Sequence, residues 1–136
     1  MNDSELRGKV HSAAYTLIKD KGFASPADVL MLIGVLSKAD YENWRFGRVD
    51  YLERVCKINL RKLSSINREI RSFAKKNNLM PSWTDYRKWG KGENRRLRFS
   101  KSGAESVERL YVTHYVSQRT IAESANRKAH EPVEDS

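Results

Sequence analysis

The chain has 136 residues, 39% of them apolar and 32% charged, with a formal net charge of +9. This length is typical of one domain with a single core, and the absence of any run of 18 apolar residues argues against a membrane span. A single cysteine excludes an internal disulfide and a cysteine-based zinc cluster, and the N-terminus lacks a secretory pattern, so we expect a cytoplasmic protein.

The positive charge is concentrated in the middle of the chain. Residues 51–101 carry fifteen basic and four acidic side chains, whereas residues 1–50 are balanced and residues 102–136 are slightly acidic. Such a distribution is typical of a protein that docks against a polyanion.

Two helices are predicted before residue 37. Apolar residues at helical spacing predict the first over residues 4–21, and Gly22 is a typical C-terminal stop. Ser25 and Pro26 suit an N-cap and a first turn, and predict a second helix over 26–36 that is apolar on nearly all sides. We expect this helix to lie in the core or to form a homodimer interface, with Gly34 allowing close approach of a neighbouring backbone.

Ser37 begins a third, short helix over residues 38–46, which Gly47 ends. Two short helices joined by a tight turn have the spacing of a helix-turn-helix motif. Asp40 and Glu42 would face phosphates unfavourably, so the third helix is a poor candidate for reading DNA unless Arg45 and Arg48 dominate its exposed end.

One long helix is predicted over residues 50–78. Asp50 and Glu53 are spaced as a capping box, and an apolar stripe keeps helical register to the end. The opposite face carries the first part of a candidate nucleic-acid site: Arg54, Lys57, Arg61, Arg68 and Lys75. Like charges three and four residues apart repel, so this row favours an anionic ligand; a merely solvated face is the competing interpretation.

Three further side chains lie on or beside the apolar stripe of this long helix. Asn59 and Asn67 would need hydrogen-bond partners there, and we expect their amides to hold a neighbouring loop. Cys56 is predicted to pack in the core rather than to act as a nucleophile.

After Pro81 the residues favour strands. Aromatic residues over 83–89, a glycine-containing turn and an alternating segment over 95–100 predict a β-hairpin in which Leu97 and Phe99 point inward. A short helix over 83–89, capped by Ser82, is the competing interpretation. The second part of the candidate site lies on this hairpin and just beyond it: Arg87, Lys88, Lys91, Arg95, Arg96, Arg98 and Lys101.

Three aromatic residues of the hairpin have two possible roles. Trp83, Tyr86 and Trp89 would either pack the hairpin onto the helices or, where exposed, stack on unpaired bases. Stacking would favour single strands or RNA over duplex DNA.

The last helix is predicted over residues 103–126, opened by Ser102 and Glu105 as a capping box. His114 is expected on its buried side as a hydrogen-bonded core histidine. The polar segment 127–136 is predicted to be a disordered tail.

Two short patterns resemble a recurring pattern in uncharacterised bacterial proteins: DYENWRFGRV at residues 40–49 followed by YLE at 51–53, and LRFSKSG at 97–103. The resemblance spans about residues 24–116. It implies a bacterial cytosolic protein, and it implies no activity and no site residues.

Together these patterns predict a mainly α fold with one β-hairpin, a winged-helix-like single domain over residues 1–126. A basic helix followed by a basic hairpin predicts nucleic-acid binding, with duplex DNA narrowly favoured over RNA and no membrane partner. The chain lacks clustered metal-ligating or catalytic residues, so we expect no enzymatic activity, no metal and no cofactor. The alternative is a protein-interaction module or assembly subunit that binds an acidic partner.

Overall fold

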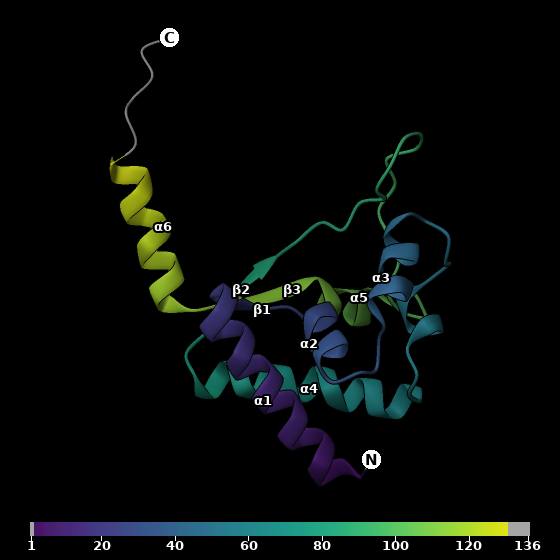
Figure 1. The fold of residues 1–136 in the computed structure, drawn as a ribbon, viewed down its shortest axis with the longest axis horizontal. Coiled ribbons are helices and arrows are strands. Elements are labelled where there is room, and N and C mark those ends of the chain that lie inside the picture. The colour runs from purple at the N-terminus through teal and green to yellow at the C-terminus, as the bar shows by residue number, and fades with distance from the viewer. Residues whose placement is uncertain (1, 131–136) are drawn as a thin grey trace.

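The computed structural model describes residues 2–130, with side chains through Arg127 (Figure 1). This part of the chain is mainly helical with one small antiparallel sheet. Its elements are α1 (Asp3–Lys21), β1 (Phe23–Ala24), α2 (Pro26–Leu32), α3 (Lys38–Arg45), the 3-10 helix η1 (Leu52–Val55), α4 (Leu60–Lys76), β2 (Met80–Trp83), α5 (Glu105–Val112), β3 (Thr113–Val116) and α6 (Gln118–His130).

The signals at the ends of the first three helices behave as predicted. Gly22 ends α1 in the left-handed conformation with a φ of 81°. The hydroxyls of Ser25 and Ser37 accept hydrogen bonds from the amides three residues on and cap α2 and α3. However, α2 ends four residues early, because Gly34 also has a φ of 81° and turns the chain. No atom lies within 4 Å of a Cβ at Gly34, so the expected close approach to a neighbouring backbone is wrong.

The predicted long helix over 50–78 is wrong in its first ten residues. The chain instead forms η1, runs extended past Cys56, and begins α4 at Asn59, whose side chain accepts a hydrogen bond from the Lys62 amide at 2.9 Å. Asn59 is thus a helix cap rather than a buried amide. The amides of Leu52 and Glu53 donate to carbonyls of residues 98 and 99, so pairing with a distant segment replaces helical hydrogen bonds.

The predicted β-hairpin is present only as a single antiparallel bridge between Arg87 and Arg96, and the competing helix over 83–89 is not formed. Leu97 and Phe99 are buried, as predicted from the alternation. The regular sheet lies elsewhere: β3 is its central strand and pairs antiparallel with both β1 and β2.

Strand β3 was expected to be part of the last helix, and that prediction is wrong. Residues 113–116 are Thr, His, Tyr and Val, and they extend where β1 and β2 offer backbone partners. Ala104 is the N-cap of α5 and makes no side-chain cap, so the predicted capping box of Ser102 and Glu105 is also absent. Helix α6 continues to His130, and the rest of the predicted tail lies outside the described residues.

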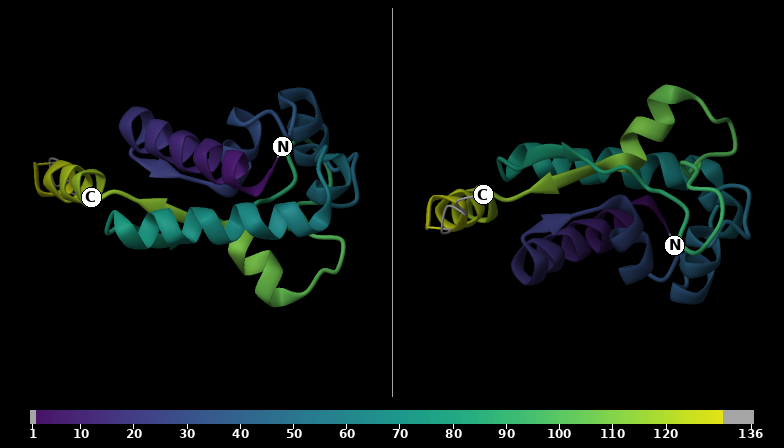
Figure 2. Two further views of the ribbon diagram at one scale, coloured as in Figure 1. Left: turned by 90° about the horizontal axis from the view of Figure 1, so that it is seen from below. Right: turned by 90° about the horizontal axis from the view of Figure 1, so that it is seen from above.

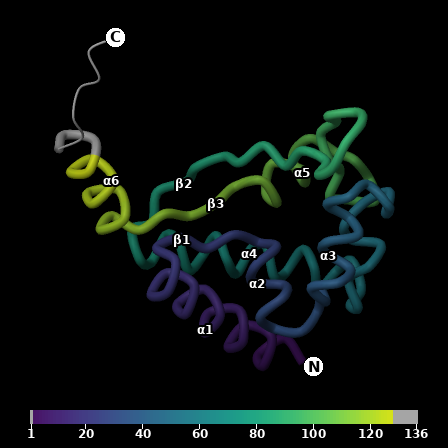
Figure 3. The backbone as a smooth tube through the Cα atoms, turned by 45° about the horizontal axis from the view of Figure 1, so that its top comes forward, coloured from purple at the N-terminus to yellow at the C-terminus, as the bar shows by residue number. Residues whose placement is uncertain are grey.

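Figure 2 shows how these elements are layered: viewed from below, α4 runs between α1 on one side and α5 on the other. Helix α6 extends away from the other elements (Figure 3). Strand β2 is an outer edge of the sheet, and all four of its residues, including Pro81, are exposed. Along the described part of the chain, none of the helices combines the length and the apolar character that crossing a bilayer demands.

A cluster of aromatic side chains fills the core where α3, α5 and the segment 86–99 meet. Trp44 is fully buried, and its ring centroid lies 4.7 Å from that of Phe99. Its indole Nε1 donates to the Arg98 carbonyl at 2.8 Å, an oxygen that also accepts from the Leu52 amide. Trp44 therefore joins α3 to residues 98–99 and, through the shared Arg98 carbonyl, to η1. These are the two segments whose pairing replaces the first part of the predicted long helix.

His114 is a hydrogen-bonded histidine, as expected, although it lies on a strand. Its Nδ1 is 3.1 Å from the Thr84 hydroxyl and its Nε2 is 2.7 Å from the Tyr86 hydroxyl. The ring stacks on Phe23 with 5.5 Å between centroids. Burial lowers the pKa of His114 below its ordinary value of 6.5.

We expect Trp44→Phe to lower the unfolding free energy by about 1–3 kcal/mol, because it removes one hydrogen bond and part of a fully buried ring. The matched control is Trp83→Phe at an exposed position, which should change stability by less than about 0.5 kcal/mol. Urea denaturation followed by circular dichroism measures both, and equal losses would contradict the central role of Trp44.

The lowered pKa of His114 predicts a loss of stability in acid. The unfolded chain binds a proton near pH 6.5 and the folded chain binds it only at lower pH, so the unfolding free energy should fall as the pH drops below about 6.5. Denaturation at pH 7 and pH 5 should show a smaller difference for His114→Gln than for the parent. An unchanged difference would mean that His114 does not contribute to the pH dependence.

Candidate nucleic-acid interface

The solvent side of α4 carries a band of cations. Apolar residues of α4 face the core, among them Leu63, Ile66, Ile70 and Phe73. With 100° between residues, Arg61, Arg68 and Lys75 lie within about 40° on the opposite side, and Arg71 and Lys76 flank them. All five are exposed, and we call this surface the outer face of α4: Arg61, Arg68, Arg71, Lys75 and Lys76.

Carboxylates neutralise little of this charge. Helix α4 has six basic residues and one acidic residue, Glu69, which lies on the α1 side and is held there by Arg7 and His11. Arg61 approaches Asp3 at 3.6 Å, and both side chains are more than 60% exposed, so this pair is weak. Among the side chains of residues 2–127, no carboxylate pairs with the other four cations of the outer face.

The outer face of α4 does not help the fold. Arg68 and Arg71 are three residues apart and Arg71 and Lys75 are four apart, so each pair repels. Each such pair costs about 0.2–0.5 kcal/mol in an exposed helix. Arg68 has one polar contact, with the Ser65 hydroxyl at 3.3 Å. This surface is therefore one that folding alone does not explain.

Two predicted members of the row on the long helix are not part of the outer face of α4. Arg54 lies on η1 and pairs with Asp50 at 3.0 Å. Lys57 is exposed but lies in the extended segment before α4, where its amide donates to the Val35 carbonyl. The break in the predicted helix separates both from Arg61, Arg68 and Lys75.

The basic residues of the loop at residues 88–95 lie apart from α4. Figures 1 and 3 show the loop around residues 88–95 at the opposite end of the molecule from α4, with the sheet between them. The continuous basic surface expected from the sequence is therefore divided into two separate surfaces.

All four arginines in the segment 87–101 make local structural bonds. Arg87 and Arg96 both pair with Asp85, at 2.7 and 3.1 Å. Arg95 donates to the Gly47 carbonyl, and Arg98 donates to the Ser100 carbonyl. The Lys88 ammonium likewise bonds the Lys91 carbonyl, whereas the side chains of Lys91 and Lys101 are exposed.

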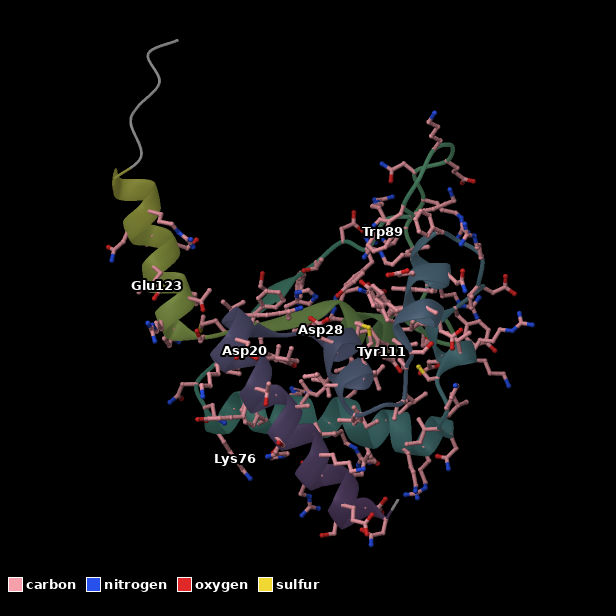
Figure 4. All side chains as sticks on the ribbon, viewed as in Figure 1. Asp20, Asp28, Lys76, Trp89, Tyr111 and Glu123 are labelled. Atoms are coloured by element: carbon pink, nitrogen blue, oxygen red, sulfur yellow. The ribbon has the colours of Figure 1, made fainter. Side chains whose placement is uncertain are left out.

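The three aromatic residues named as possible stacking partners differ in exposure. Trp83 is 69% exposed. Tyr86 is buried and bonds His114, which is the packing role of the two considered for it. Trp89 is 39% exposed and is covered in part by the Arg45 guanidinium, 4.5 Å from its ring centroid. Figure 4 marks Trp89 far from α4.

The sheet register places Trp83 on the side that faces α4. Trp83 pairs with Thr113 and Pro81 pairs with Tyr115, so these four side chains lie on one face of the sheet. Burial raises the pKa of Tyr115, and the nearby Arg71 guanidinium opposes this shift. The Trp83 face of the sheet is thus the face adjacent to Arg71.

A buried polar contact fixes α5 beside α4. The Glu53 carboxylate of η1 accepts from the Lys101 amide at 2.8 Å and from the Tyr111 hydroxyl of α5 at 2.6 Å. The Asn67 amide of α4 lies against the same hydroxyl, and burial raises the pKa of Tyr111. This role for Asn67 agrees with the expected buried amide. The contact joins η1, α4 and α5, and it leaves α5 flanking α4 as in Figure 2.

Sequence reasoning missed three cations. Arg71 and Lys76 lie at the two margins of the outer face of α4, about 40° and 60° outside the row of Arg61, Arg68 and Lys75, so a narrow row read from the sequence leaves them out. Arg109 of α5 lies with its guanidinium 5.4 Å from the Trp83 ring centroid. No local signal in the sequence connects Arg109 with Trp83, because sheet pairing brings them together.

Metal-ligating side chains do not gather among the described residues. Residues 2–130 contain no group of three metal-ligating side chains. The Cys56 thiol contacts the Leu52 carbonyl, and burial raises its pKa to about 12, which suits packing rather than nucleophilic attack. Comparisons with models of protein families, with curated proteins and with solved structures find no match.

Because the cations of the outer face of α4 repel, Arg68→Glu should leave the unfolding free energy unchanged or raise it by up to about 1 kcal/mol. Glu at this position would attract Arg71 one turn away. Leu63→Ala on the buried side of the same helix is the contrast, with an expected loss of about 2–5 kcal/mol. Urea denaturation measures both, and a clear loss for Arg68→Glu would assign Arg68 a structural role.

Proposed function

We propose that this protein binds nucleic acid, and duplex DNA in particular, through the outer face of α4. The observation that carries the proposal is the band of five exposed cations, four of which have no carboxylate partner among the described residues. A duplex presents a regular array of phosphates, and arginine can bond a phosphate through two N–H groups. Three of the five cations are arginines.

The order of the elements supports a winged-helix-like arrangement. Helix α4 is followed by two adjacent antiparallel strands, β2 and β3, and the sheet order is β1-β3-β2. In this interpretation α4 is the recognition helix, and the connection between β2 and β3 is an enlarged wing, residues 84–112. The part of this wing that flanks α4 is α5, and the loop at residues 88–95 lies on the far side.

The dimensions of α4 also fit a duplex. Arg61 and Lys75 are fourteen residues apart, which is about 21 Å along the helix axis. The major groove of B-DNA is about 12 Å wide and admits one helix. A helix of this length lying in the groove can therefore reach phosphates on both sides.

The proposal assigns no catalytic role and requires no metal or cofactor. A lone cysteine and the resemblance to bacterial proteins fit a cytoplasmic setting, which is part of the proposal.

An acidic protein partner is the alternative ligand. The surface of α2 that is available for a homodimer is small. Val29 and Leu30 are buried in the core, whereas Leu32 is 53% exposed.

The salt dependence of binding tests the proposal. If about six phosphates are contacted, by the outer face of α4 and Arg109, the logarithm of the affinity for duplex DNA should fall with the logarithm of the salt concentration, with a slope of about −5. Fluorescence anisotropy with a 20-base-pair duplex between 50 and 200 mM salt gives this slope. No binding at 50 mM salt would overturn the proposal and favour an acidic protein.

Two double variants of equal charge locate the interface. Arg68→Glu with Lys75→Glu should weaken duplex binding by tenfold or more and make the slope less steep by about two. Lys88→Glu with Lys91→Glu changes the net charge by the same amount, in the loop at residues 88–95 that lies away from α4, and should cost less than about threefold. Equal losses in the two variants would mean that net charge, and not the outer face of α4, drives binding.

A further inference from the structure

We propose that the groove between β2 and α5 holds an unpaired nucleobase stacked on Trp83. This inference rests on the proposed function and extends it from the phosphate backbone to a base.

The groove has the dimensions and the wall that a base requires. It encloses about 500 Å³, is open to solvent on one side, and has Trp83 as its exposed aromatic wall. It is lined by residues of β2, the wing and α5, namely Trp83, Thr84, Asp85, Arg96, Arg109 and Val112 among others.

Trp83 is held in place without being covered. Trp83 is 69% exposed, and the Arg109 guanidinium lies 5.4 Å from its ring centroid. A cation over an indole is attracted to its π system and restrains the ring. The remaining ring surface is open, and an exposed tryptophan of this kind is a sequence-tolerant stacking platform for bases.

The polar groups around Trp83 match a nucleotide. Arg87 and Arg96 hold the pKa of Asp85 below its usual range, so this carboxylate stays charged and can accept from the amino group of a base. The Glu105 carboxylate is 91% exposed at the groove and offers the same acceptor. Arg96 and Arg109 are 70% and 60% exposed. They pair with Asp85 at 3.1 Å and with Glu105 at 3.8 Å, and such exposed pairs are weak enough for both guanidiniums to turn to the flanking phosphates.

The position of the groove favours a base over other occupants. Trp83 lies on the sheet face adjacent to Arg71, and α5 flanks α4, so a strand bound on the outer face of α4 passes beside the groove. Bases in an intact duplex are stacked inside it, and only an unpaired or extruded base can reach the Trp83 ring.

The test compares a fully paired 20-base-pair duplex with the same duplex carrying one bulged 2-aminopurine. The parent protein should bind the bulged duplex about tenfold more tightly, and the 2-aminopurine fluorescence should fall as the base stacks on Trp83. Trp83→Ala should lose this preference and the fluorescence change. Trp83→Phe should retain part of the preference.

Met80→Ala is the matched control, because Met80 is an exposed residue of the same strand on the opposite sheet face. It should keep both the preference and the fluorescence change, and thermal denaturation should show that all variants fold. The inference is overturned if the parent shows no preference for the bulge, or if Trp83→Ala retains it. The proposed function fails separately, if reversal of Arg68 and Lys75 leaves binding to the paired duplex intact.

Discussion

The position of the outer face of α4 relative to η1 and α5 depends on the Tyr111 hydroxyl. This hydroxyl donates to Glu53 of η1 and lies against Asn67 of α4, so a single buried group connects three elements that are far apart in the chain. Glu53 also accepts from the Lys101 amide, which fixes the end of the wing. Moving one of these elements away would leave buried polar groups without hydrogen-bond partners, which is costly. The three elements therefore keep one relative position. The outer face of α4 and the α5 flank are therefore presented together.

Cations in this protein serve two different purposes. The arginines of the segment 87–98 are used to build a wing that has little regular structure of its own, through carbonyls and through Asp85. The cations of the outer face of α4 make few such contacts and repel one another. Formal charge in the sequence does not distinguish these purposes, whereas the bonding partners of each guanidinium do.

The parts of the fold that follow from the sequence are those set by neighbouring residues. Gly22, Ser25 and Ser37 act within one helical turn, and their patterns predicted the helix ends correctly. The break before α4 and the strand β3 depend on partners dozens of residues away. Residues 52–53 pair with 98–99, and residues 113–116 pair with 23–24 and 80–83, and no local pattern contains that information. The candidate site was predicted for Arg61, Arg68 and Lys75 of α4. Arg71 and Lys76 at the margins of that face were missed, and so was Arg109, which tertiary pairing brings in.

Strand β2 is an edge strand of the sheet. Its residues Met80 and Trp83 are exposed, on opposite faces of the sheet. Such a strand is ordinarily a template on which another chain adds, leading to aggregation. Pro81 lacks an amide hydrogen, and the strand is only four residues long, so the ladder available to a second molecule is brief and interrupted. Trp83 can therefore stay exposed on the edge strand of the sheet without that strand becoming a site of self-association.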